Sequence, residues 1–263
     1  MTTAPMPAVF FGHGSPMNAL ERNRYSEAWR GIGAMMPKPK AILAVSAHWM
    51  TRGVAVTAME WPRTIHDFGG FPRELFEVRY PAAGDPQLAE RVRALLAPTD
   101  VQPDQDWGLD HGTWSVLTHV FPDADVPVVQ LSLDATRPPR DHYQLAARLA
   151  PLRDEGVLIL GSGNVVHNLG VMQWSEDAPP YDWAQRFSAA ARDAVLSGAH
   201  ERLIAYDSLD HEARRSVPTP EHYLPLLYVL AQQRPGEAVS LPVEGIEYGS
   251  IDMLSVAIGL GPV

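Results

Sequence analysis

The chain has 263 residues, of which 46% are hydrophobic and 20% charged, a composition typical of a globular protein that can bury a core without disulfides or a structural metal. It has no cysteine, which excludes disulfides, thiolate metal ligands and cysteine nucleophiles. The formal net charge of −10 argues against a nucleic-acid partner, because phosphate binding needs clustered Lys and Arg. No targeting leader and no apolar run of membrane-spanning length is visible, which predicts a cytoplasmic protein without a membrane partner.

Apolar runs and helical patterns alternate along the chain. The runs predict strands buried on both faces. They are Ala8–Phe11, Ala41–Ala47, Val54–Ala58, Val126–Leu133, Val157–Gly161, Ala238–Pro242 and Leu254–Ile258. The patterns between them predict helices over Tyr25–Met36, Pro86–Ala97, Arg140–Leu152, Trp183–Leu196 and Glu221–Gln232. This alternation predicts an α/β fold, with residues 1–263 forming a single domain whose central, largely parallel or mixed sheet is flanked by helices.

Three of the apolar runs are followed by a histidine that stands at or just past their carboxyl end. The stretch AVFFGHG ends around His13, AILAVSAHW around His48, and LILGSGNVVHNLG reaches His167. Ligand crevices in open α/β sheets form beyond the carboxyl ends of the strands. These three side chains are therefore expected to meet in one crevice, although they are far apart in the sequence.

Three imidazoles, or two with a carboxylate, can hold a divalent first-row metal. Further candidates are His111 in GLDHGTW, His66 in the loop TIHDFGGFP, and Glu221 with His222 at the first turn of the last helix, for which Thr219 is the expected N-cap and Pro220 the first helical residue. The sequence lacks the zincin, deaminase, phosphate-loop and nucleophile-elbow motifs. The remaining histidines are expected to be ordinary surface or helix residues: His119, His142, His200 and His211.

The motifs as a set resemble the class III extradiol ring-cleavage dioxygenases, and in particular the 4,5-DOPA dioxygenase branch. They are FFGHGSPMN, VSAHW, TIHDFGGFP, DHGTWSVL, VPVVQLSLD, GSGNVVHNL and TPEHYLPLLYVLA, in an order that spans Pro7 to Gly259. The resemblance implies an oxidoreductase that opens the ring of a catechol, such as a DOPA-like or related phenylpropanoid diol, with dioxygen at a non-haem metal. The implied product is a muconic semialdehyde.

The resemblance also implies roles for individual residues. His13, His48 and His222 match metal ligands, with Glu221 open as the alternative third ligand because more distant relatives use a glutamate there. His167 matches a catalytic acid/base that this branch can also count as a metal ligand, and His111 matches a second catalytic, substrate-contacting histidine. The implied metal is Fe(II) for activity, and Zn(II) suits the same site.

Two other readings of the same histidines stay open. The first is a zinc-dependent hydrolase that uses them to activate water, and the second is a catalytically silent metal-binding relative. Selectivity among catechols is expected to depend on loop side chains around His66 and Tyr223. The sequence has no coiled-coil pattern that would indicate an oligomeric state.

Overall fold

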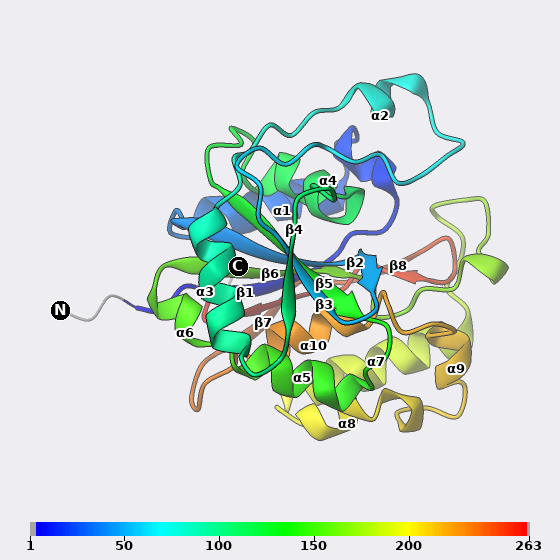
Figure 1. Cartoon of the computed structure of the whole chain (residues 1–263). Coiled ribbons are helices and arrows are strands. Elements are labelled where there is room, and N and C mark those ends of the chain that lie inside the picture. Colours follow the sequence, from blue (N-terminus) through cyan, green and yellow to red (C-terminus); the bar gives the residue numbers. More distant parts are fainter. Residues whose placement is uncertain (1–3, 262–263) are drawn as a thin grey trace.

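The computed structural model describes residues 4–261 and has one eight-stranded mixed sheet with helices on both faces (Figure 1). In the order in which they lie side by side, its strands are β4 (Val101–Asp104), β3 (Val54–Thr57), β5 (Val128–Asp134), β2 (Ala41–Thr51), β6 (Val157–Gly163), β1 (Ala8–Gly12), β10 (Ser255–Ile258) and β7 (Val239–Val243). A separate two-stranded ribbon pairs β8 (Ile246–Glu247) with β9 (Ile251–Asp252). The predicted fold class is confirmed.

Both faces of the sheet are buried, which explains why its strands have near-continuous apolar sequences. In β1, Ala8 and Phe10 join one hydrophobic cluster, whereas Val9 and Phe11 join the other, because successive side chains of a strand point to opposite faces. The helices α1 (Arg24–Met35) and α4 (His111–Val120) cover one face. The other face is covered by α3 (Pro86–Leu96), α5 (Pro139–Ala147), α7 (Asp182–Leu196), α8 (His200–Ile204) and α10 (Leu224–Leu230).

The order of the central strands decides what meets at their carboxyl ends. β5, β2, β6 and β1 are parallel to one another, whereas β3 and β10 run antiparallel to their neighbours in this group. The register places Ser162 of β6 beside Ser46 of β2 and Phe11 of β1. His13 and His48 each follow these aligned positions by two residues, so they emerge at the same edge of the sheet.

Several predicted boundaries are wrong, and prolines explain most of them. The helix predicted over Arg140–Leu152 is instead α5 followed by α6 (Pro151–Asp154), since a proline inside a helix removes a backbone donor and clashes with the preceding turn. For the same reason Pro225 lies in the first turn of α10, which begins at Leu224 rather than at Glu221. β4 was missed because its sequence VQPD has a proline and little apolar character, both tolerated in an edge strand.

Thr219 is not the N-cap that the sequence predicts. Its hydroxyl donates a 2.7 Å hydrogen bond to the Glu221 carboxylate, and residues 221–223 form a turn that precedes α10. Other short helices were not predicted: α2 (Arg73–Glu77), α8 and α9 (Ala213–Ser216). Among residues 4–261, no helix combines the length and apolar character needed to cross a membrane.

Candidate functional site

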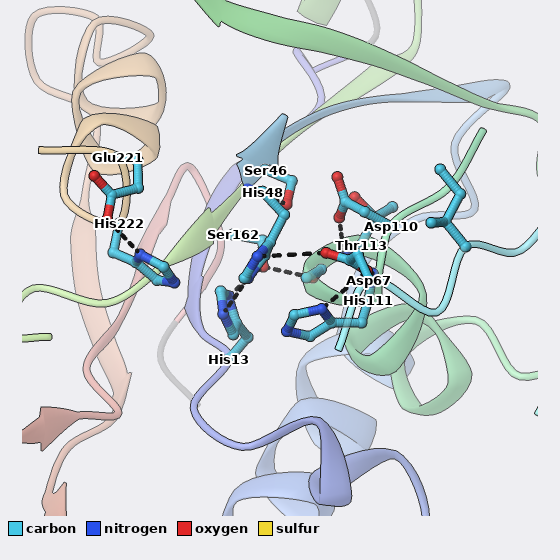
Figure 2. A network of polar contacts seen from close by, with 12 residues as sticks. His13, Ser46, His48, Asp67, Asp110, His111, Thr113, Ser162, Glu221 and His222 are labelled. Atoms are coloured by element: carbon cyan, nitrogen blue, oxygen red, sulfur yellow. Dashed lines mark hydrogen bonds and ion pairs between the residues drawn. The ribbon is translucent and has the colours of Figure 1, made fainter. Parts of the chain in front are cut away.

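A pocket of about 580 Å³ opens at the carboxyl ends of the central strands. Five histidines line it, and they come from five separate segments of the chain: His13, His48, His111, His167 and His222. Figure 2 shows four of them, with the side chains of His13, His48 and His111 lying close together and His222 approaching from the other side. The expectation that His13, His48 and His167 share one crevice is therefore met.

His13 is fixed by the turn that follows β1. Its backbone N–H donates to the Gly163 carbonyl at 3.0 Å, and its own carbonyl accepts from the Asn18 side-chain amide at 3.1 Å. Gly14 adopts a φ of +60°, a left-handed conformation that glycine takes without strain. The chain can therefore reverse directly after His13 and leave the imidazole facing the pocket.

His222 reaches the site because its turn lies directly on the end of β6. Its carbonyl accepts a 2.8 Å hydrogen bond from the Asn164 backbone N–H. A Cβ at Gly163 would lie 2.1 Å from that same carbonyl oxygen, so only glycine permits this approach. The glycines of the GSGN motif thus bring β6 and the His222 turn into contact.

One ring nitrogen from each of three histidines converges at the floor of the pocket. The Nε2 atoms of His13 and His48 are 3.1 Å apart, and one nitrogen each from His13, His48 and His222 lie within 4.8 Å of one another. Their Nδ1 atoms face other protein groups, at 2.9 Å from Ser162 Oγ, 3.4 Å from an Asp67 oxygen and 3.3 Å from a Glu221 oxygen respectively. Such outer partners orient imidazole ligands toward a metal.

These imidazoles are held in their neutral form. Burial lowers the pKa of His13 well below its usual value, and the neighbouring histidines, His48 first, lower it further. The pKa of His222 is also well below the usual value, through burial and then the charge of His167. Burial and then His111 lower the pKa of His48 to about 3. Neutral imidazoles present lone pairs, which is the form that binds a metal ion.

His167 lies beside this group and not within it. Its ring stacks on that of His222, with centroids 3.4 Å apart and planes 9° apart. It forms a separate cluster with Glu221 and His222, whose ligand atoms are again within 4.8 Å of one another. Burial lowers the pKa of His167 to about 4, below the ordinary value near 6.5 that the sequence alone suggests, so the ring is neutral in the free protein.

Asp67 lies between His48 and His111 and contacts both. One of its oxygens lies 3.0 Å from His111 Nδ1, the other lies 3.4 Å from His48 Nδ1, and it also accepts the His111 backbone N–H at 2.9 Å. Burial opposes its ionisation, yet the contacts with His111 and His48 leave its pKa below the ordinary value. Sequence reasoning missed Asp67, although it directly follows His66 in the loop that was expected to cover the pocket.

His111 is the first residue of α4, and Asp110 caps that helix. One Asp110 oxygen accepts from the Thr113 backbone N–H at 3.1 Å, and the other accepts from the Gln130 side-chain amide at 2.7 Å. Burial, and then the charge of Asp67, raise the pKa of Asp110 above its ordinary value. Asp110 therefore fixes the start of α4, and with it the backbone position of His111 (Figure 2).

Two predicted substrate contacts lie elsewhere. His66 is not among the residues that line the pocket; its Nε2 lies 3.0 Å from the Val78 carbonyl and its ring packs against Trp114. Tyr223 is fully buried in the core, where its hydroxyl donates to the Leu203 carbonyl at 3.0 Å. The structure gives neither side chain a route to a ligand in this pocket, because one is held in the loop's aromatic cluster and the other points into the helical layer.

The rest of the pocket wall is aromatic and apolar. It includes Phe68 and Phe71 from the loop before α2, together with Leu169 and Trp174 from the segment after His167. Leu169 is 59% exposed and Trp174 is 92% exposed, which is unusual for side chains of this size. Tyr248, at the turn between β8 and β9, completes the wall.

Comparison with known proteins identifies relatives along nearly the whole chain. Residues 10–243 match the family model described as the catalytic LigB subunit of aromatic ring-opening dioxygenase. A protein of Escherichia coli named 4,5-DOPA dioxygenase extradiol is 52% identical, over 98% of this chain and 97% of its own length. A protein of Beta vulgaris with the same name is 40% identical over 82% and 83% of the two chains.

The fold has a solved counterpart as well. The crystal structure of an uncharacterised protein from Escherichia coli aligns with a TM-score of 0.85 and 48% identity, and the alignment covers 97% of this chain and 100% of the other. Because the family model covers most of the chain and these relatives align over most of their lengths, the chain belongs to the LigB family of aromatic ring-opening dioxygenases, the class III extradiol enzymes.

Proposed function

We propose that this enzyme opens the ring of a catechol beside its two hydroxyl groups, using dioxygen and a divalent metal held by His13, His48 and His222, within a single catalytic domain of residues 1–263. The observation that carries the proposal is the convergence of three imidazole nitrogens within 4.8 Å in a pocket whose walls are largely aromatic and apolar. Three protein ligands leave coordination positions open for substrate and dioxygen.

The donor set fits a non-haem metal. All three ligands are imidazoles, and Ser162, Asp67 and Glu221 each lie near the ring nitrogen that faces away from the centre. Imidazole suits both Fe(II) and Zn(II), so geometry and ligand type accept either ion. We propose Fe(II) as the ion that supports turnover, since ring opening by dioxygen requires a redox-active metal, and Zn(II) as an alternative occupant.

Of the two candidates for the third ligand, Glu221 and His222, the geometry favours His222. The Glu221 carboxylate accepts from the Thr219 hydroxyl and lies beside His222 Nδ1, and it belongs to no cluster that contains His13 or His48. Glu221 thus lies next to the ring nitrogen of His222 that faces away from His13 and His48. We therefore assign Glu221 the role of orienting His222, as outer-sphere carboxylates do for metal-bound imidazoles.

If bound by these three histidines, the ion would supply Lewis acidity and open coordination positions for the diol and dioxygen. His167 lines the same pocket outside the three-ligand group, where it can accept a proton from one substrate hydroxyl and return it as the ring opens. His111 turns Nδ1 toward Asp67, so its Nε2 can accept a hydrogen bond from a substrate hydroxyl and, once it has taken up that proton, donate to the reacting oxygen atoms. Both atoms of dioxygen enter the product, a muconic semialdehyde, and one carbon–carbon bond of the ring is broken.

The proposed substrate is a catechol with a short side chain, such as a DOPA-like or related phenylpropanoid diol. A 580 Å³ pocket is within the range of sites for small ligands, and its aromatic walls suit a planar ring. The two relatives named 4,5-DOPA dioxygenase extradiol support this substrate class.

Oxygen uptake tests the proposal directly. Protein loaded with Fe(II) under anaerobic conditions and then mixed with aerated catechol should consume one dioxygen per catechol, with the absorbance of a ring-opened semialdehyde appearing at the same rate. A zinc hydrolase would consume none, and a silent relative would bind metal without changing any catechol in a panel. Protein loaded with Zn(II) is the matched control, and oxygen uptake by that form equal to the Fe(II) form would contradict the assignment.

A further inference from the structure

The pocket has the histidine cluster at one end and Trp174 with Tyr248 at the other, which we call the outer end. Within residues 4–261, neither Lys nor Arg lines the pocket, so the outer end has no positively charged side chain in its lining. Beyond the histidines, the polar side chains of the pocket are Ser15, Asp67 and Tyr248. A carboxylate on a substrate would therefore enter this pocket without a cationic partner, and burying an unpaired charge is costly. Substrate charge should thus affect binding even where the catechol ring itself fits.

Trp174, Glu176 and Tyr248 form one unit at this outer end. The Tyr248 hydroxyl donates to the Glu176 carboxylate at 3.2 Å, and the Tyr248 carbonyl accepts from the Gln173 backbone N–H at 2.9 Å. Tyr248 has a φ of +51°, a conformation that a bulky residue adopts only when its surroundings hold it there. Trp174 and Tyr248 both line the pocket, and the exposed Glu176 carboxylate lies next to that lining through its contact with the Tyr248 hydroxyl.

Other carboxylates lie close to Glu176. The pKa of Glu247 is raised to about 7 by burial and then by the charge of Glu176, and the pKa of Glu21 is raised by the same two causes. Arg24 offsets this charge only in part, since it lowers the pKa of Glu247 less than burial and Glu176 raise it. These carboxylates lie close to Tyr248 and make that end of the lining electronegative through Tyr248's neighbours. Aromatic faces beside carboxylates are the surroundings in which an alkylammonium group is stabilised.

This rim is joined to the reaction centre by a short segment of backbone. His167 pairs with Ile251, three residues after Tyr248, and the Asn168 backbone N–H donates to the Ser250 carbonyl at 3.3 Å. His167, Ile251 and Tyr248 all line the same pocket. A substrate whose diol lies at the histidines can accordingly extend its side chain along this wall toward Trp174.

We propose that Trp174, Glu176 and Tyr248 bind a cationic substituent of the substrate, so that the enzyme prefers catechols with an alkylammonium side chain over those with a carboxylate side chain. This inference rests on the proposed function, because it assumes that the diol is held at the histidine cluster. Glu176 is a specificity-determining residue in this proposal, and it takes no part in the chemistry of ring opening.

The test uses three catechols with side chains of similar length and different charge: dopamine, 4-propylcatechol and 3,4-dihydroxyphenylpropionate. With the Fe(II)-loaded enzyme, kcat/KM should be about tenfold higher for dopamine than for the anionic compound, the combined effect of an ion pair and a cation–π contact at an exposed rim. The neutral compound should fall between them. The difference should appear in KM, while kcat stays similar.

Glu176→Gln keeps an acceptor for the Tyr248 hydroxyl and removes the charge. It should reduce the ratio of kcat/KM for dopamine to kcat/KM for the anionic compound to about threefold or less. Glu90→Gln is the matched control, since Glu90 lies on α3 in an exposed pair with Arg93. That variant should keep the tenfold ratio.

Equilibrium binding gives a readout that is independent of turnover. Anaerobic titration of the Zn(II)-loaded protein with the three compounds, followed by tryptophan fluorescence, should give the lowest Kd for dopamine and the highest for the anionic compound. Glu176→Gln should reduce the differences between these Kd values. If 4-propylcatechol binds but is not opened by the Fe(II) form, the proposed function fails, and the binding order still decides this inference. Equal affinities for the three compounds, an order unchanged by Glu176→Gln, or no binding at all would overturn it.

Discussion

Buried histidines serve different purposes in two regions of this protein. His142, in α5 within the helical layer, has Nδ1 3.0 Å from the Tyr228 hydroxyl and Nε2 3.2 Å from the Asp134 carbonyl. In the pocket, by contrast, His13 and His48 turn Nε2 atoms toward each other at 3.1 Å. Burial lowers the pKa in both places, so a shifted pKa does not distinguish a site from a core. What distinguishes the site from the core is that the ring nitrogens of several histidines converge on one another.

The largest effect should come from removing a member of the converging group. His48→Ala is expected to lose bound metal and to reduce ring opening to background, because two imidazoles remain where three are needed. The fold should persist, since the change removes a partly buried polar side chain that belongs to neither hydrophobic cluster. Metal content by elemental analysis and oxygen uptake measure the two effects. His211→Ala, at an exposed histidine, is the control, and full metal content in His48→Ala would refute the ligand assignment.

A smaller and more selective loss is expected at the stacked histidine. His167→Ala should retain its metal and lower kcat by about 10²- to 10⁴-fold, the usual range for removing a general acid or base. The same elemental analysis decides between the two roles open for this residue. A metal-free His167→Ala protein would make His167 a ligand and end its assignment as acid/base.

Loss of an outer partner should weaken the site without abolishing it. Asp67→Asn keeps the shape of the side chain but removes the charge shared by His48 and His111. Metal affinity is expected to fall by about 10- to 100-fold, as is typical for outer-sphere partners of imidazole ligands. Competition with a chelator gives the affinity, and Asp123→Asn on the exposed surface is the matched substitution. Equal affinity in the two variants would show that Asp67 does not orient the ligands.

The smallest effect on activity belongs to the core histidine, where stability should respond to pH. The pKa of His142 is lowered to about 4 in the folded chain, whereas an unfolded histidine titrates near 6.5. As pH falls from 6.5 to 4, the unfolded chain takes up a proton here that the folded chain does not, so stability is lost over that window. His142→Gln should reduce the slope of unfolding free energy against pH by up to about 1.4 kcal/mol per unit.

Urea denaturation between pH 4.5 and 7 measures this slope, with both proteins freed of metal so that release of the ion does not add to it. Catalytic activity of metal-loaded His142→Gln at pH 7 should stay close to that of the parent. An unchanged slope would mean that the folded chain protonates His142 as readily as the unfolded chain does.

The amino-acid sequence by itself determined most of the segments that become strands of the sheet, and the polar residues that follow them. Apolar runs predicted seven strands of the sheet, and His13, His48 and His167 could be picked out because each stands near the end of such a run. His222 was singled out with Glu221 in a different context, the first turn of the helix predicted over Glu221–Gln232. Local pattern was sufficient for these residues because burial and backbone conformation depend mainly on near neighbours in the chain.

Tertiary structure alone decided which of these residues meet. The parallel order β2–β6–β1 brings His13 and His48 to one edge, and the contact of Gly163 with the His222 carbonyl adds the third imidazole. It also turned His66 and Tyr223 away from the pocket and brought in Asp67, Trp174 and Tyr248. Side-chain direction in a loop or turn depends on the segments packed against it, which lie far away in the sequence, and no local pattern records them.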